Sequence, residues 1–267
     1  MKVIVSHDID HIRAWEHRNM MIPKHMIRSS IELITLNISL KEYILRIKEL
    51  FVNKWHNLED IVEFNLRHQI PATFFMGMNN GLGLDYNISD AKKWVNFLSE
   101  KGFDVGVHGI AYQNIVIMQE EYNLMKNILN HQNFGIRMHY LRNDESTIGK
   151  LASCGYLFDT TLQEDVNPYQ VSSMYEFPLH IMDVDVMYKG GSKWMNKSVE
   201  ELKMITKERI DFLITKKLEY MTLLFHDRYF TDSFKAWKEW YTWSIAYLKE
   251  QDCEFISYTD AMKEIKK

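Results

Sequence analysis

Two aspartates near the start of the sequence, Asp8 and Asp10, have the residue type and spacing most suggestive of chemistry. They follow the apolar run Val3-Ile4-Val5. Alternate side chains of a strand share a face, so both carboxylates point the same way if the strand continues that far. Two carboxylates on one face repel unless a cation or a shared proton relieves them. One aspartate could hold a metal ion while the other accepts a proton. The structural alternative is a solvent-exposed turn in which both aspartates only cap the residues that follow.

Two histidines also follow apolar runs that are typical of strands. His108 ends the segment Asp104-Val105-Gly106-Val107-His108, and His226 follows Leu223-Leu224-Phe225. In parallel α/β proteins, sites form at the carboxyl ends of the strands. A single histidine there is more often structural, but imidazole also suits zinc and similar divalent metals. We therefore expect both histidines to share a rim with the aspartate pair.

The elements that must position these residues alternate between short strand-like runs and longer segments of helical period. This alternation favours parallel βαβ units, and their number favours a (β/α) barrel over an open doubly wound sheet. The predicted strands are Lys2–Ser6, Thr73–Met76, Asp104–Val107, Gly135–Tyr140, Tyr156–Phe158, Tyr175–Ile181, Met221–Phe225 and Glu254–Ile256. The predicted helices are Leu40–Val52, Leu58–Arg67, Ala91–Lys101, Glu120–Leu129, Ser198–Thr215 and Phe234–Glu250.

The segment 12–69 is too long for one crossover, so we expect a helical insertion of two or three helices after the first strand. Nothing else in the chain resembles a linker or a repeat, and we expect residues 1–267 to form one domain. Later in the chain, Ser198 precedes Glu201 by three residues, which predicts a capping box at a helix start.

Composition excludes several classes of protein. The chain has 267 residues, 46% hydrophobic and 25% charged, with a formal net charge of −4, which favours a globular protein and no nucleic-acid partner. Cys154 and Cys253 lie too far apart in sequence to suggest a disulfide framework or a thiolate zinc site. No apolar run is long enough for a secretory signal or a transmembrane helix, so we expect a cytoplasmic protein. The sequence predicts no particular oligomeric state.

Several motifs occur together in one order: Asp8-Ile9-Asp10, Ala72-Thr73-Phe74-Phe75-Met76-Gly77, Gly102–Gly109, Gly155-Tyr156-Leu157-Phe158-Asp159-Thr160-Thr161-Leu162, Glu176-Phe177-Pro178-Leu179 and Leu224-Phe225-His226. In this order they resemble the polysaccharide deacetylase superfamily, the NodB-homology enzymes of carbohydrate esterase family 4. The resemblance covers about residues 2 to 260 apart from the insertion. It implies a distorted (β/α)7 TIM-like barrel and a metal-dependent hydrolase that removes an N- or O-acetyl group from a sugar or glycan precursor.

The resemblance also implies roles for individual residues. Asp8 would be the catalytic base and His226 the general acid that protonates the leaving amine. Asp10 and His108 would bind a divalent metal such as zinc. Arg137 would steer the base, and the backbone N–H of Tyr140 would help to hold the oxyanion on the substrate side.

The sequence departs from the family pattern at two positions. The family's second metal histidine, four residues after the first, is Tyr112 here, and the proline of its RxPY segment is His139. Arg137-Met138-His139-Tyr140-Leu141-Arg142 instead resembles a sub-branch with VGVHG and RxHYLR segments. Our hypothesis is that His139, two residues after Arg137 on a strand, supplies the missing ligand; the alternative is that it packs structurally. Asp183 is grouped with Tyr140 at the substrate side, where it could orient His226 and raise its pKa, or cap a strand.

Other functions compete with a carbohydrate deacetylase. An Asp-x-Asp pair after an apolar strand also opens haloacid-dehalogenase-like phosphatases. That chemistry needs a later Ser or Thr at a strand end, a Lys and an acidic pair, but Met221–His226 ends in His and no acidic pair follows a late strand. With Tyr112 in place of a histidine, the chain could be a catalytically degenerate protein that binds carbohydrate or serves in assembly. The family also includes hydrolases of non-peptide amide C–N bonds in nitrogen heterocycles.

Overall fold

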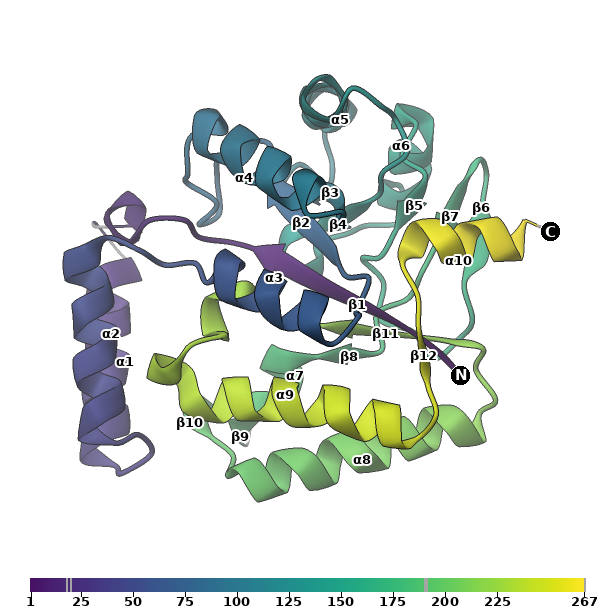
Figure 1. Ribbon diagram of the computed structural model, residues 1–267. Helices are drawn as coiled ribbons and strands as arrows, with labels where there is room; N and C mark the ends of the chain where they lie inside the picture. Colours follow the sequence, from purple (N-terminus) through teal and green to yellow (C-terminus); the bar gives the residue numbers. More distant parts are fainter. Residues whose placement is uncertain (18, 20, 190–191, 267) are drawn as a thin grey trace.

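The computed structural model describes residues 1–17, 19, 21–189 and 192–266. Its centre is a strongly curved sheet in the order β6-β7-β5-β4-β3-β2-β1-β11-β8, with β12 pairing with the start of β1. Every pair in this sheet is parallel except β6 with β7 (Figure 1). The strands are β1 (Lys2–Ile9), β2 (Thr73–Gly77), β3 (Asp104–Gly109), β4 (Ile136–Met138), β5 (Phe158–Asp159), β6 (Tyr169–Val171), β7 (Met174–Glu176), β8 (Ile181–Met182), β11 (Tyr220–Leu224) and β12 (Glu254–Phe255).

β1 forms the middle of the sheet because nearly all of its residues are buried. Seven of its eight residues are buried, and both faces are covered, as is typical of parallel sheets. Val3 pairs with Met221 of β11, and Asp8 pairs with Phe75 of β2. This register brings the polar end of β1 to the same edge as the ends of its neighbours.

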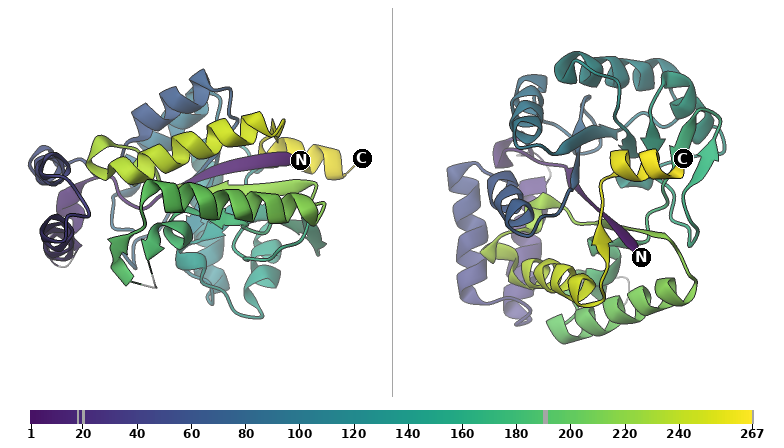
Figure 2. Two further views of the ribbon diagram at one scale, coloured as in Figure 1. Left: turned by 90° about the horizontal axis from the view of Figure 1, so that it is seen from below. Right: turned by 45° about the vertical axis from the view of Figure 1, so that its right-hand side comes forward.

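Helices surround the sheet, as both views in Figure 2 show. The predicted capping box is confirmed: the Ser198 hydroxyl accepts from the Glu201 N–H, and the Glu201 side chain accepts from the Ser198 N–H. No helix among the described residues is long and apolar enough to cross a membrane. The helices after β2 are α4 (Ile88–Glu100), α5 (Ile115–Leu129), α6 (Thr147–Cys154), α7 (Asp183–Met187), α8 (Val199–Thr215), α9 (Lys235–Glu250) and α10 (Tyr258–Ile265).

The segment between β1 and β2 is helical, as predicted. It contains a 3₁₀ turn, η1 (Ala14–His17), and the helices α1 (Met21–Ile34), α2 (Leu40–Val52) and α3 (Leu58–Arg67). α1 and α2 lie side by side at the left of Figure 1, and α3 lies against the strands. Arg46 of α2 is buried and bonds Glu32 of α1, while its Nε donates to the carbonyl of Ser233, 2.9 Å away. These bonds tie the helix pair to the rest of the molecule.

Two strand predictions are wrong in extent. The strand predicted over Gly135–Tyr140 ends at Met138, and His139–Leu141 form a 3₁₀ turn. The strand predicted over Tyr175–Ile181 is two strands, β7 and β8, separated by a segment that contains Pro178, which has no N–H for a ladder.

The curved sheet does not close into a full barrel. β7 forms an antiparallel hairpin with β6, which the sequence reading missed. Among the described residues, no pairing joins β6 to β8, so the two ends of the sheet stay apart. A second, two-stranded sheet pairs β9 (Tyr188–Lys189) with β10 (Ser192–Asn196) outside the barrel.

Candidate functional site

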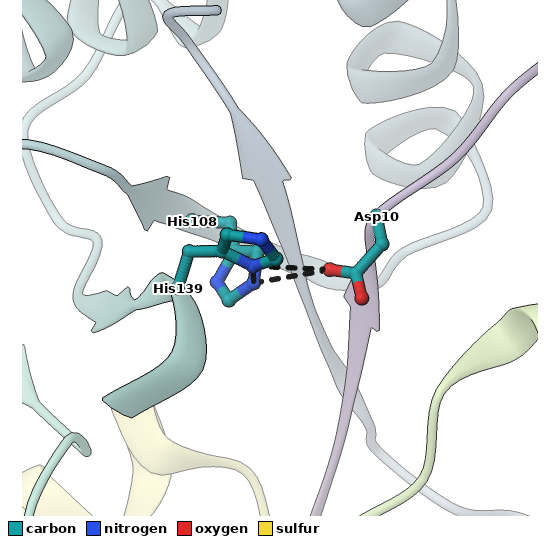
Figure 3. A group of neighbouring side chains, drawn as sticks. All are labelled: Asp10, His108 and His139. Atoms are coloured by element: carbon teal, nitrogen blue, oxygen red, sulfur yellow. Dashed lines mark hydrogen bonds and ion pairs between the residues drawn. The ribbon is translucent and has the colours of Figure 1, made fainter. Parts of the chain in front are cut away.

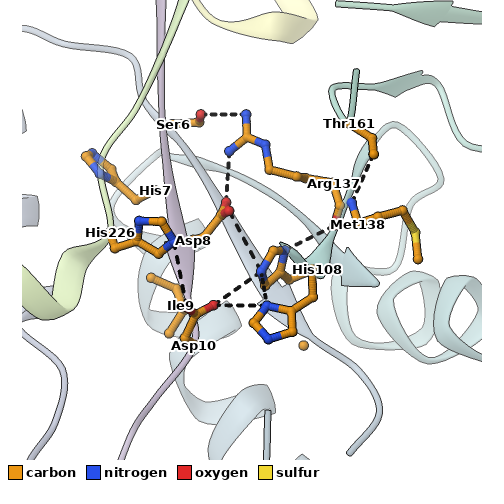
Figure 4. Close-up of polar contacts among 12 residues, drawn as sticks. Ser6, His7, Asp8, Ile9, Asp10, His108, Arg137, Met138, Thr161 and His226 are labelled. Atoms are coloured by element: carbon orange, nitrogen blue, oxygen red, sulfur yellow. Dashed lines mark hydrogen bonds and ion pairs between the residues drawn. The ribbon is translucent and has the colours of Figure 1, made fainter. Parts of the chain in front are cut away.

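The polar residues predicted at strand ends lie together at one edge of the sheet. Asp8 lies near the end of β1 and Asp10 directly after it, His108 lies in β3, Arg137 in β4, and His226 is the second residue after β11 (Figure 4). All but Asp10 are buried or nearly so, and Asp10 keeps 18% of its side chain exposed. The site is therefore a largely buried polar cluster whose most exposed carboxylate is Asp10.

Asp10, His108 and His139 form a group that could hold a metal ion. His108 Nε2 lies 3.2 Å from Asp10 Oδ1, and His139 Nδ1 lies 3.5 Å from the same oxygen. The two imidazole nitrogens are 3.0 Å apart (Figure 3). One carboxylate oxygen and two imidazole nitrogens are ligands that zinc and similar cations accept.

Backbone carbonyls fix which nitrogen of each imidazole faces the group. His108 Nδ1 lies 3.0 Å from the carbonyl of Arg137, and His139 Nε2 lies 3.1 Å from the carbonyl of Leu82. A carbonyl only accepts, so these outer nitrogens carry the hydrogens. The same outer hydrogen bonds orient histidine ligands in metal sites.

The inner atoms of the group lack a counter-charge of their own. Asp10 Oδ1 is buried and has no hydrogen-bond partner among the described residues. Burial raises the pKa of Asp10, but the facing imidazoles of His108 and His139 outweigh burial and hold it well below its usual range. An ionised oxygen and two converging nitrogens repel unless a positive charge, a proton or a metal ion, lies among them. The residues present therefore fit a divalent cation.

His139 reaches this group by a different route from the one predicted. The sequence reading placed it on a strand with Arg137, but it lies in the 3₁₀ turn after β4. The turn rather than strand alternation directs its ring toward His108. Tyr112 does not join the group: its ring lies 4.4 Å from the Arg142 guanidinium carbon.

Arg137 holds Asp8 from behind. Its Nη1 donates to Asp8 Oδ1 at 2.8 Å, and its Nη2 donates to Ser6 Oγ at 2.9 Å. Nη2 also lies 3.2 Å from Thr160 Oγ1 and from the Tyr258 hydroxyl. Burial raises the pKa of Asp8, but the Arg137 charge outweighs it, so the pKa falls below its usual value. Asp8 is thus a fixed, ionised carboxylate.

His226 is held on the opposite side of Asp10. Its Nδ1 lies 2.8 Å from Asp183 Oδ1, and its backbone N–H donates to Asp183 Oδ2 at 2.7 Å. Burial lowers the pKa of His226, but the negative charge of Asp183 outweighs it and raises the pKa to about 10. Nε2, the remaining ring nitrogen, lies 3.7 Å from Asp10 Oδ2. His226 thus presents an N–H toward the site.

Of the roles expected for Asp183, the structure shows the contact with His226 rather than a position at the substrate side. Asp183 is fully buried, and both of its oxygens bond His226, so it lies behind that imidazole. Tyr140, by contrast, is 66% exposed and adopts a left-handed backbone with φ of 56°. Such a conformation in a non-glycine residue is costly and is often kept at functional sites.

Other residues around the site were not predicted. Ser6, Thr160 and Tyr258 surround the Arg137 guanidinium, and the carbonyl of Leu82 orients His139. Thr160 belongs to the Gly155–Leu162 motif, but nothing in the sequence relates it to Arg137, and the other three residues are single residues far from their partners in the chain. His7 points away from the site: its Nδ1 bonds the carbonyl of Phe225.

Comparisons with known proteins show which fold this is. No family model and no curated protein sequence matches the chain. Among solved structures, a presumed polysaccharide deacetylase from Mycobacterium smegmatis aligns over 99% of this chain and 90% of its own, with a TM-score of 0.67 and 12% identity.

Two further structures align at the same identity. A peptidoglycan N-acetylglucosamine deacetylase aligns over 97% of this chain and 86% of its own, with a TM-score of 0.51. A carbohydrate esterase family 4 pseudoenzyme from Bacillus anthracis aligns over 98% of this chain and 65% of its own, also at 0.51. The chain thus has the fold of the polysaccharide deacetylases, which confirms the predicted distorted barrel.

Proposed function

We propose that the protein is a metal-dependent hydrolase that removes an acetyl group from an amino sugar or glycan precursor. One observation carries this proposal: Asp10, His108 and His139 converge between a carboxylate held by Arg137 and an imidazole held by Asp183. Metal-assisted hydrolysis of an acyl bond needs a general base, a metal site and a general acid close together, and the site offers a residue for each of these roles.

In this proposal Asp10, His108 and His139 hold a divalent cation, with zinc the first candidate. When bound, the cation would polarise the acyl carbonyl and make water more acidic. The outer hydrogen bonds of the two histidines aim their inner nitrogens into the group, so a cation that displaces the proton between them would be bound without either ring turning.

Asp8 is the proposed base. Its Oδ1 is occupied by Arg137, whereas Oδ2 lies 3.8 Å from His108 Nε2 and so faces the ligand group. A water bound beside Oδ2 would lose its proton to this oxygen. Arg137 fixes the orientation of the carboxylate and does not itself contact the substrate, because it is fully buried.

His226 is the proposed acid. It is protonated at neutral pH because Asp183 stabilises the imidazolium, and it would give the Nε2 proton to the leaving amine. Asp183 is a positioning residue in this step. The exposed turn at Tyr140 borders the same opening, and its N–H would donate to the oxyanion that forms at the acyl carbon.

The principal alternative is a catalytically degenerate protein, since a pseudoenzyme shares this fold. The complete Asp8–Arg137 and His226–Asp183 pairs argue against it, because neither pair has a reason to persist in a purely structural barrel.

Acetate release tests the proposal. The purified protein, loaded in turn with zinc, cobalt and nickel, is incubated with N-acetylglucosamine oligomers, O-acetylated sugars and acetylated sugar phosphates. Release of acetate that stops on addition of a chelator supports the proposal. No release with any metal, together with no bound metal, would favour the degenerate protein.

A further inference from the structure

A cavity of about 380 Å³ lies between the helical insertion and the segment after β11. We name it the insertion pocket. Three of its lining residues are cations, Lys24 and Arg28 of α1 and Arg228 after β11, and none is an aspartate or glutamate. Trp55, Tyr229 and Phe234 form its aromatic wall. All of the lysine, arginine, aspartate and glutamate residues in the lining are thus cations, although the chain has a formal net charge of −4.

The charge of the insertion pocket is only partly neutralised by its surroundings. Glu32 accepts hydrogen bonds from two guanidinium groups. Arg28 Nε donates to its Oε1 at 2.8 Å, and Arg46 donates to its Oε2. Arg228 Nη2 bonds Glu49 at 2.7 Å. Three guanidinium groups therefore bond two carboxylates, and Lys24 bonds neither, so the directly bonded groups leave an excess of positive charge.

Two of the lining cations have unused capacity to bind. Lys24 is exposed and makes no ion pair with any residue that the structure describes. Arg28 Nη2 is buried and has no hydrogen-bond partner within the same residues. A buried donor without a partner costs the folded state free energy, and a bound anion would relieve that cost.

The insertion pocket adjoins the proposed acid rather than the base. His11, which follows Asp10 in the chain, lines the cavity, as does Tyr229. The Tyr229 N–H donates to the carbonyl of His226 at 3.1 Å, and the two rings lie 6.1 Å apart. The proposed acid protonates the leaving amine. The sugar that carries this amine therefore lies on the side of the insertion pocket, and the acetyl group lies toward Asp8.

We infer that the insertion pocket binds a phosphate group on the sugar, so that the substrate is an acetylated amino sugar phosphate or nucleotide-linked amino sugar rather than a neutral polymer. This inference rests on the proposed function. Arginine and lysine side chains are the usual protein ligands of phosphate. Three cations provide more positive charge than a single carboxylate group on a substrate would need. The aromatic wall would pack against the apolar face of the sugar or of an attached base.

Substrate preference tests the inference. The metal-loaded protein is assayed for acetate release from N-acetylglucosamine, N-acetylglucosamine 1-phosphate, N-acetylglucosamine 6-phosphate, UDP-N-acetylglucosamine and N-acetylmuramic acid. We expect kcat/KM for at least one phosphorylated substrate to exceed that for N-acetylglucosamine by about tenfold or more, the effect of one charged hydrogen bond. This preference should fall as salt is added. Equal values for neutral and phosphorylated substrates would overturn the inference, as would a preference for the carboxylate of N-acetylmuramic acid.

A variant of Lys24 links the preference to the insertion pocket. Lys24 is exposed and has no ion pair to lose, so Lys24→Gln should fold normally. It should raise KM for the phosphorylated substrate several-fold and leave kcat, and both constants for N-acetylglucosamine, unchanged. Lys41→Gln, which changes an exposed lysine of α2 that does not line the insertion pocket, is the matched control. Equal effects of the two variants would place the phosphate elsewhere and overturn the inference.

A binding measurement separates this inference from the proposed function. Calorimetry with N-acetylglucosamine 1-phosphate and N-acetylglucosamine requires no turnover. If the phosphate binds in a Lys24-dependent way but no substrate releases acetate, phosphate binding by the insertion pocket is supported and the deacetylase activity is contradicted. Release of acetate from neutral sugars with no phosphate binding would support the deacetylase and exclude phosphate binding by the insertion pocket.

Discussion

His108 and His139 face each other across 3.0 Å through inner nitrogens whose partners on the outer side are backbone carbonyls. Neither ring can turn its hydrogen inward without losing an outer hydrogen bond. Two neutral rings with their hydrogens on the outer side would point lone pairs at each other, and a proton or a cation between them removes that repulsion. The third atom of the group is an aspartate oxygen with no hydrogen-bond partner among the described residues. This arrangement gives the first prediction.

Replacing His139 with alanine should lower metal affinity by at least about a hundredfold, since loss of even an outer partner of a ligand costs ten- to a hundredfold. The metal content of purified wild type and His139→Ala, measured after dialysis against a weak chelator, tests this. Tyr112→Phe is the control, because that ring packs near Arg142 and not in the ligand group, and it should bind metal as wild type does. Unchanged occupancy in His139→Ala would show that His139 is structural.

Replacing Asp8 with asparagine should lower kcat by about 10² to 10⁴, the usual contribution of a general base. Metal content should stay the same, because Asp8 is not in the ligand group. The asparagine oxygen can still accept from Arg137, but the buried guanidinium loses its counter-charge, so the melting temperature should fall. Steady-state kinetics, metal analysis and thermal unfolding measure the three effects. A variant that keeps more than about a tenth of the wild-type kcat would remove Asp8 from the role of base.

Replacing Asp183 with asparagine should move the pH profile of kcat. Burial lowers the pKa of His226 and the carboxylate of Asp183 raises it to about 10, so removing that charge lets the pKa fall. A general acid is active while protonated, and activity is lost as pH rises through its pKa. The alkaline limb of the profile should therefore move to lower pH in the variant, with little change in KM. A profile that keeps its alkaline limb while kcat falls uniformly would indicate a purely structural role.

Glu121 on α5 should make the folded state less stable as pH rises. Burial raises the pKa of its carboxyl from 4.5 to about 7, although Oε1 accepts from the Ile110 N–H. The folded state binds the proton more tightly than the unfolded state, so stability falls between pH 4.5 and 7, by up to roughly 3 kcal/mol. Glu121→Gln should remove this fall and raise the melting temperature at pH 8 but not at pH 4.5.

The neighbouring exposed Glu120 provides the control for that experiment. Glu120→Gln should change the melting temperature little at either pH. If both variants follow the wild-type dependence on pH, the carboxyl of Glu121 does not titrate near neutrality.

The strands and the residues at their ends could be predicted because each depends on local pattern. Apolar runs followed by Asp8, Asp10, His108 and His226 needed no knowledge of long-range contacts. The position of His139 could not be derived this way, since a turn and not strand alternation directs it.

Two further features could not be predicted from the sequence, for different reasons. The antiparallel β6–β7 hairpin has strands of only three residues, too short for a periodic signal. The insertion pocket combines α1 with residues after β11, and no local pattern relates Lys24 to Arg228.

The bonds around Arg137 also bear on how the protein acquires its shape. Ser6 and Tyr258 both contact this guanidinium, yet they lie 131 residues before it and 121 residues after it. Contacts between such distant segments close late during folding, because the loops they form cost the most entropy. A partly folded chain would hold Asp8 loosely and be inactive. In refolding from denaturant, recovery of activity should therefore lag behind recovery of the circular-dichroism signal of the helices. Enzymatic activity would then report when the whole barrel has formed.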